Sequence, residues 1–152
     1  MNRVYRILAT GGCSGYFPKA PGTFGSVVIL FVYWILPAFS PSLLGLVIVA
    51  MFLVGVWSAT LMTNENNGQD SDPSVVVIDE MVGMLVAVFL LPKRFVWMCL
   101  AFLLFRLLDV VKPFPVNKLE AFPKGWGVML DDVGAGLYAN IILQILRGIL
   151  RA

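Results

Sequence analysis

Five acidic residues stand among apolar neighbours, and their types and spacing could support chemistry. Asp79 and Glu80 occur in VVVIDEMVGM, Asp109 in FRLLDVVKP, and Asp131 and Asp132 in GVMLDDVGAG. An acid at the centre of a bilayer costs about 2.5–3.5 kcal/mol even on insertion scales, so five of them would cost on the order of 10 kcal/mol. A chain of this size must therefore compensate them, either with cations or with a bound metal.

Ion pairing accounts for some of these acids but not for the group. Arg106 precedes Asp109 by one helical turn and could neutralise it, and acids near helix N-termini are favoured by the helix dipole. Only Arg106 and Lys112 are at hand for five acids, however. Carboxylate ligands without His or Cys select Mg²⁺, Mn²⁺ or Ca²⁺ over zinc. We therefore predict a divalent metal site made of Asp79, Glu80, Asp109, Asp131 and Asp132.

A glycine-rich segment, GGCSGYFPKAPGTFGS at residues 11–26, is the second chemical feature. Glycines let backbone amides approach an anion, and a hydroxyl can cap the apolar helix that follows. Taken alone the segment reads as an ordinary turn, and it lacks the Gly-Lys-Ser/Thr ending of a Walker loop. Beside an acidic cluster it predicts a phosphate cradle, with cationic partners from elsewhere in the chain. The predicted phosphate-binding residues are Lys19, Thr23, Gly25, Ser26, Arg106 and Lys112.

The composition predicts a membrane protein and excludes several classes of function. Hydrophobic residues make up 59% and charged residues 13% of the 152 residues, against roughly 45–50% and about 25% in soluble domains, and the mean hydropathy is +0.88. A net charge of +2 without a basic tract excludes a nucleic-acid partner. The absence of histidine excludes Ser-His-Asp catalysis and imidazole zinc sites.

The elements that must position these residues are predicted to be helices of one domain, residues 1–152. Apolar stretches at 24–39, 42–62, 75–91, 95–111 and 129–149, with a short helix before Gly11, predict an all-α, polytopic membrane bundle of about five to six helices. On an up-and-down path, all the residues singled out above lie at one membrane face. Six Lys and Arg on the N-terminal side against four on the other favour an N-terminus inside the cell.

Four segments, PKAPGTFGS, DPSVVVIDEMVG, FRLLDVVKPFP and GWGVMLDDVGAG, together resemble the phosphatidylglycerophosphatase A family and follow its order. The resemblance implies a Mg²⁺-dependent, multi-pass enzyme of the bacterial cytoplasmic membrane, with one helix enclosed by the others and its active site on the cytoplasmic face. The implied reaction hydrolyses phosphatidylglycerophosphate to phosphatidylglycerol and inorganic phosphate. The implied partner is a phospholipid substrate, and no protein partner is implied. Cys13, Tyr16 and Lys124 depart from the expected pattern.

The residues and the resemblance agree on the class of mechanism. The acids would hold one or two Mg²⁺ ions, and the cations would clamp the phosphoryl oxygens. Whether one acid acts as general base or as nucleophile stays open. The alternative, a carboxylate-lined ion or proton transporter, predicts acids staggered through the bilayer depth. A third class, the CDP-alcohol phosphotransferases, is disfavoured, because the sequence after DDVGAG does not continue as their motif does.

Overall fold

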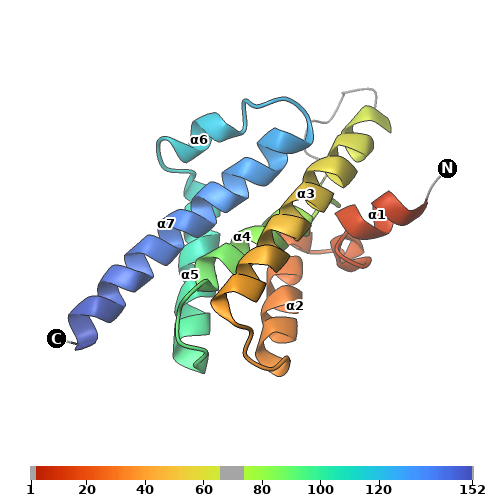
Figure 1. Ribbon diagram of the computed structural model, residues 1–152. Helices are drawn as coiled ribbons and strands as arrows, with labels where there is room; N and C mark the ends of the chain where they lie inside the picture. Colours follow the sequence, from red (N-terminus) through yellow and green to blue (C-terminus); the bar gives the residue numbers. More distant parts are fainter. Residues whose placement is uncertain (1–2, 66–73, 152) are drawn as a thin grey trace.

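The structure, a computed structural model, describes residues 3–65 and 74–151 (Figure 1). Over those residues its regular secondary structure is entirely helical. This confirms the predicted all-α class for the described part of the chain. The elements in order are α1 (Arg3–Ala9), the short 3-10 helix η1 (Ser14–Tyr16), α2 (Pro21–Ile35), α3 (Pro41–Glu65), α4 (Ile78–Val88), α5 (Phe95–Val111), α6 (Val116–Leu119) and α7 (Gly125–Arg151).

The helix boundaries follow from local sequence signals. Helix α5 has the predicted bounds, and α1 is the short helix expected before Gly11. Helix α2 begins at Pro21, three residues before the predicted start, because proline is favoured in the first turn of a helix, where its missing N–H costs nothing. The four-residue α6 was not predicted and lies within the Pro- and Gly-rich segment between α5 and α7.

Two helices are long and apolar enough to cross a membrane by length and composition, over Pro41–Asn64 and Gly125–Leu150. The helices at the other predicted apolar stretches, α2, α4 and α5, are shorter. Helix α4 has 11 residues and, at 1.5 Å per residue, is about 16 Å long, roughly half the thickness of a hydrocarbon core. The structure thus provides two spanning candidates among the described residues, and the polytopic bundle of five to six helices stays a prediction.

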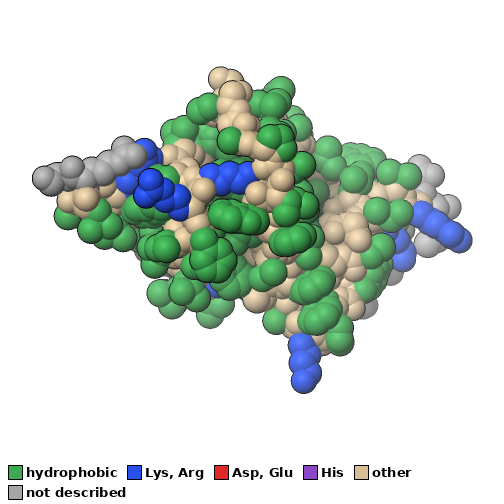
Figure 2. Space-filling model, turned by 90° about the horizontal axis from the view of Figure 1, so that it is seen from below, with side chains coloured by type: hydrophobic (Ala, Val, Ile, Leu, Met, Phe, Trp, Pro, Cys, Tyr) green, Lys and Arg blue, Asp and Glu red, His purple; other side chains and the backbone are tan. Residues whose placement is uncertain are grey.

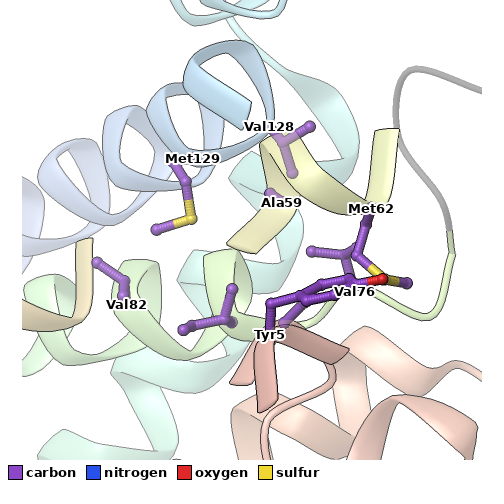
Figure 3. Packing of buried hydrophobic residues seen from close by; sticks show 9 residues of the cluster. Tyr5, Ala59, Met62, Val76, Val82, Val128 and Met129 are labelled. Carbon is purple, nitrogen blue, oxygen red and sulfur yellow. The ribbon is translucent and has the colours of Figure 1, made fainter. Parts of the chain in front are cut away.

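Helix α4 is the enclosed helix of the bundle, as the family resemblance implied. It lies against α2, α3, α5 and α7 (Figure 1), and every one of its residues except Glu80 is buried. A hydrophobic core holds α4 against its neighbours. In this core Tyr5 of α1, Met62 of α3 and Val76 pack together, with Val82 and Met129 beside them (Figure 3). The Val77 N–H also donates to the Ala9 carbonyl at 3.0 Å.

Two glycines bring α4 and α7 into backbone contact. A Cβ placed on Gly136 would lie 2.3 Å from the Gly83 carbonyl oxygen, and one on Gly83 would lie 2.7 Å from the Asp132 carbonyl oxygen. Small residues permit such close helix crossings. One turn N-terminal to these glycines are Asp79 on α4 and Asp132 on α7, so the crossing places these two acids side by side.

The C-terminal end of α4 is capped by polar side chains of α7. The Asn140 amide donates to the carbonyls of Ala87 at 3.0 Å and Phe89 at 2.6 Å. Gln144 donates to Phe89 at 3.2 Å, and Arg147 to the Leu90 carbonyl at 2.7 Å. A helix that ends inside a membrane protein needs such donors, because lipid provides none.

Candidate active site

A polar pocket of about 380 Å³ lies where four helix ends meet. These are the starts of α2, α4 and α7 and the end of α5, which carry the acids and the end of the glycine-rich segment that the sequence predicted to share one membrane face. Its lining includes all five predicted acids. The lining residues are Ala20, Pro21, Gly22, Thr23, Ser74, Val76, Asp79, Glu80, Arg106, Asp109, Val110, Lys112, Asp131 and Asp132.

Three of the five acids converge closely enough to share a metal ion. Asp79, Glu80 and Asp132 each offer a carboxylate oxygen, and these oxygens lie within 4.8 Å of one another. Asp79 and Asp132 are 5% and 4% exposed. Within the described part of the chain, Glu80 Oε2 and Asp132 Oδ2 are buried without a hydrogen-bond partner. Buried carboxylate oxygens are costly unless a cation compensates them, and such hard donors fit Mg²⁺ or a similar ion.

The other two acids hold cations. Asp109 Oδ2 lies 2.8 Å from an Arg106 guanidinium nitrogen, and Asp131 Oδ2 lies 2.6 Å from Lys112 Nζ. Asp131 Oδ1 also accepts the N–H of Asp132 at 3.0 Å. Asp109 and Asp131 therefore line the same pocket as the three-acid cluster and pair with two of the three predicted phosphate-binding cations. Their assignment as metal ligands stays a prediction.

Lys112 is held as a cation at the mouth of the pocket. It ends α5 in a left-handed conformation, with φ of 44°, and it pairs with Glu120 at 3.2 Å as well as with Asp131. Burial by itself lowers the pKa of Lys112, but the hydrogen bonds and charges of Asp131 and Glu120 raise it above its ordinary value. The ammonium group is thus charged throughout the physiological pH range.

The first turn of α2 forms the opposite wall of the pocket. The amides in the first turn of a helix have no partner within it and carry the positive end of its dipole. Gly22 leaves room for the Glu80 carboxylate, because a Cβ on it would lie 1.6 Å from Glu80 Oε1 and would force that side chain to move. Gly22 was not among the predicted phosphate-binding residues. Pro21 marks the first position of a helix and was the available signal for it.

The predicted phosphate-binding residues of the glycine-rich segment separate in the structure. Thr23 lines the pocket. Lys19 is exposed and does not line it. Ser26 is fully buried, and its hydroxyl donates to the Gly22 carbonyl at 3.0 Å. Gly25 allows close packing, since its Cβ would lie 3.0 Å from Val77 Cβ. The roles of these four residues in binding phosphate stay predictions.

Two further residues of the site were missed by sequence reasoning. Ser74 lines the pocket just before α4, and Glu120 holds Lys112 from the α6 segment. No local pattern separates Ser74 from other loop serines. Glu120 lies in a Pro- and Gly-rich loop and is brought to Lys112 only by the fold.

Comparison with known proteins identifies the family. Residues 7–147 match the Phosphatidylglycerophosphatase A family. The chain is 32% identical to Phosphatidylglycerophosphatase A of Escherichia coli, over 96% of this chain and 85% of the relative. It is 34% identical to Phosphatidylglycerophosphatase A of Haemophilus influenzae, over 90% and 85%.

A Bacteroides thetaiotaomicron protein with the provisional name phosphatidylinositol-3-phosphatase is 38% identical, over 95% of this chain and 94% of the relative. No solved structure matches the chain. The family match and two of these relatives agree with the resemblance carried by the four sequence segments, and the relatives are named as phosphatases. The chain therefore belongs to the phosphatidylglycerophosphatase A family and is a phosphatase.

Proposed function

We propose that this protein is a Mg²⁺-dependent phosphatase that hydrolyses phosphatidylglycerophosphate to phosphatidylglycerol and inorganic phosphate. The observation that carries the proposal is the convergence of Asp79, Glu80 and Asp132, with ligand oxygens within 4.8 Å, in a pocket that also contains Arg106 and Lys112. A carboxylate cluster beside two cations suits a metal and a phosphoryl group together.

The three converging acids would hold the metal. Mg²⁺ bound there would supply Lewis-acid stabilisation of the charge on the phosphoryl group. Overall, water is added across the bond between phosphorus and the glycerol oxygen: the water oxygen ends on phosphorus, and a proton ends on the glycerol oxygen.

The remaining groups of the pocket orient the phosphoryl group and neutralise its charge. Arg106 pairs with Asp109 through one nitrogen and has further N–H groups for an anion. Lys112 adds a second positive charge, and the first turn of α2 adds the positive end of a helix dipole. Thr23 supplies a hydroxyl on that turn.

The membrane placement is part of the proposal. The two spanning candidates and the lipid substrate support a multi-pass protein of the bacterial cytoplasmic membrane. The shorter helices α2, α4 and α5 would complete one domain within the bilayer. The excess of Lys and Arg on the N-terminal side favours a pocket on the cytoplasmic face. The transporter alternative finds no support, because the acids share one pocket and the relatives are named as phosphatases.

The relatives differ in the lipid that their names imply, so the assay must compare substrates. Purified wild-type protein and Glu80→Gln are given phosphatidylglycerophosphate, phosphatidylinositol 3-phosphate or phosphatidic acid, with Mg²⁺ or with EDTA. We expect wild type to release phosphate fastest from phosphatidylglycerophosphate, only with Mg²⁺, and Glu80→Gln to be inactive. Undiminished release in EDTA would contradict the metal. Preference for the inositol lipid would contradict the substrate.

A further inference from the structure

We propose that an apolar groove between α2 and α5 holds one fatty-acyl chain of the phospholipid whose phosphate enters the pocket. The inference rests on the proposed function and adds to it a subsite for the lipid tail. The groove has a volume of about 330 Å³ and is lined from α2 by Val27, Phe31 and Trp34, and from α5 by Phe95, Met98 and Cys99.

The groove and the polar pocket lie along the same faces of the same two helices. On α2, Thr23 lines the pocket and Val27, one turn later, lines the groove. On α5, Arg106 lines the pocket and Cys99, two turns earlier, lines the groove. From Thr23 to Trp34 the path along α2 is about 16 Å at 1.5 Å per residue. A lipid with its phosphate in the pocket would therefore lay its tail along this path.

The chemistry of the groove suits a hydrocarbon chain. It has no charged side chain in its lining, and its rims are open, with Phe31 62% and Phe95 70% exposed. Trp34 and Phe95 meet edge to face, with ring centroids 6.4 Å apart, at the end remote from the pocket. The surface seen in Figure 2 is largely apolar, with Lys and Arg in view and no Asp or Glu.

The groove would position the substrate more than increase its affinity. Lipid tails are as apolar as leucine, so transfer of a chain from bilayer to groove gains little hydrophobic free energy. A chain fixed along α2 and α5 would instead orient the phosphate relative to the acids, and orientation contributes strongly to rate. The groove therefore distinguishes long-chain substrates by turnover.

A second apolar groove provides a matched control. It has a volume of about 450 Å³ and is lined from α1 and α3 by residues such as Ile7, Ala50 and Val54, and from α4 by Ile78 and Met81. Neither α1 nor α3 contributes to the lining of the polar pocket. Ala50 lies on α3, so a side chain added there fills this groove from a helix that does not line the phosphate site.

The test compares Cys99→Phe, which fills the α2–α5 groove, with Ala50→Phe, which fills the other. Each is assayed in mixed micelles with dioleoyl and with water-soluble dihexanoyl phosphatidylglycerophosphate. We expect Cys99→Phe to lose about tenfold or more in kcat on the dioleoyl substrate and less than twofold on the dihexanoyl one. Ala50→Phe should match wild type on both. Equal losses on both substrates, or no loss on either, would overturn the inference.

Photocrosslinking of the wild type keeps the inference testable if Cys99→Phe does not fold. Phosphatidylglycerophosphate with a diazirine in one acyl chain should label peptides of α2 and α5 and spare those of α3. Unlabelled substrate should compete, whereas bulk phosphatidylcholine should not. Labelling of α3 instead, or competition by bulk lipid, would overturn the acyl subsite. A wild type that cleaves neither substrate would refute the proposed function itself, a result distinct from either outcome.

Discussion

Arg106 pairs with an acid of the pocket and is also a proposed ligand of the substrate phosphate. One guanidinium nitrogen lies 2.8 Å from Asp109 Oδ2, and the side chain is 22% exposed, so it is neither fully buried nor freely solvated. A guanidinium offers five N–H donors in a planar fork and can hold a carboxylate and a phosphate at once, whereas an ammonium acts as a single point charge. We therefore expect that lysine cannot replace Arg106 in binding phosphate.

We predict that Arg106→Lys lowers kcat for phosphate release by about 10²-fold, the usual effect of losing one donor to a transition state. Its melting temperature should stay near that of wild type, because lysine still pairs with Asp109. Arg94→Lys, at the exposed start of α5, serves as the control and should match wild type. Near wild-type turnover of Arg106→Lys would mean that Arg106 only neutralises Asp109.

At this scale the sequence indicated which residues gather and one of their ion pairs, Arg106 with Asp109, but not the pairing of Lys112. The apolar flanks of the five acids were sufficient to single them out, because isolated acids in such surroundings are costly. The pairing of Lys112 with Asp131 joins residues 19 positions apart and depends on the crossing of two helices. The burial of Ser26 and the exposure of Lys19 likewise depend on how α2 packs, which its local motif does not determine.

At the scale of the elements, the crossing of α4 and α7 sets the geometry of the acid cluster. Gly83 and Gly136 allow the two backbones to touch, and one turn away Asp79 and Asp132 face each other across the crossing. Any side chain at Gly136 would have to move one backbone away from the other, since a carbonyl cannot rotate out of the way as a flexible side chain can.

We predict that Gly136→Ala destabilises the protein by about 1–3 kcal/mol, as overpacking does, and strongly reduces activity by separating Asp79 from Asp132. Gly148→Ala on the same helix is the matched control, because a Cβ there meets nothing within 4 Å. It should leave activity unchanged and stabilise by about 0.5–1 kcal/mol through helix propensity. Thermal unfolding and phosphate release check both. Equal behaviour of the two variants would contradict the close crossing.

The sequence predicted the helical stretches well and the crossing poorly. Hydrophobic runs bounded by Pro and Gly located the helices within a few residues. The short length of α4 was hidden, because its apolar run extends through the segments on either side of it. Its enclosure depends on Gly83, Gly136 and the donors Asn140 and Gln144, whose roles appear only when α7 lies across it.

At the scale of the whole molecule, the proposed N-inside orientation predicts that the site lies on the cytoplasmic side of the membrane. The turn that contains Cys13 lies at the same end as the pocket, because the neighbouring Gly15 packs against the Val75 carbonyl, with 2.0 Å to its placed Cβ, just before α4. Cys13 is exposed. One cysteine thus reports the orientation of the site.

In the Cys99→Ser variant, where Cys13 is the remaining cysteine, we predict labelling by a membrane-impermeant maleimide from the cytoplasmic side. Inside-out vesicles should be labelled and right-side-out vesicles spared until they are permeabilised. Cys13→Ser, which keeps Cys99 on the apolar face of α5, should resist the reagent in both. Labelling of Cys13 only from the periplasmic side would contradict the N-inside orientation.

The central claim is that Asp79, Glu80 and Asp132 form a divalent metal site, and the most direct test is the response of the melting temperature to Mg²⁺. Wild type should be stabilised by Mg²⁺, by about 2.7 kcal/mol at 100 times its Kd. Asp132→Asn should be as stable as wild type in EDTA, or slightly more stable, because it removes repulsion among buried acids, and it should gain little from Mg²⁺. Glu120→Gln, outside the cluster, should respond like wild type. A wild type whose melting temperature ignores Mg²⁺, beside an Asp132→Asn variant destabilised even in EDTA, would contradict the claim.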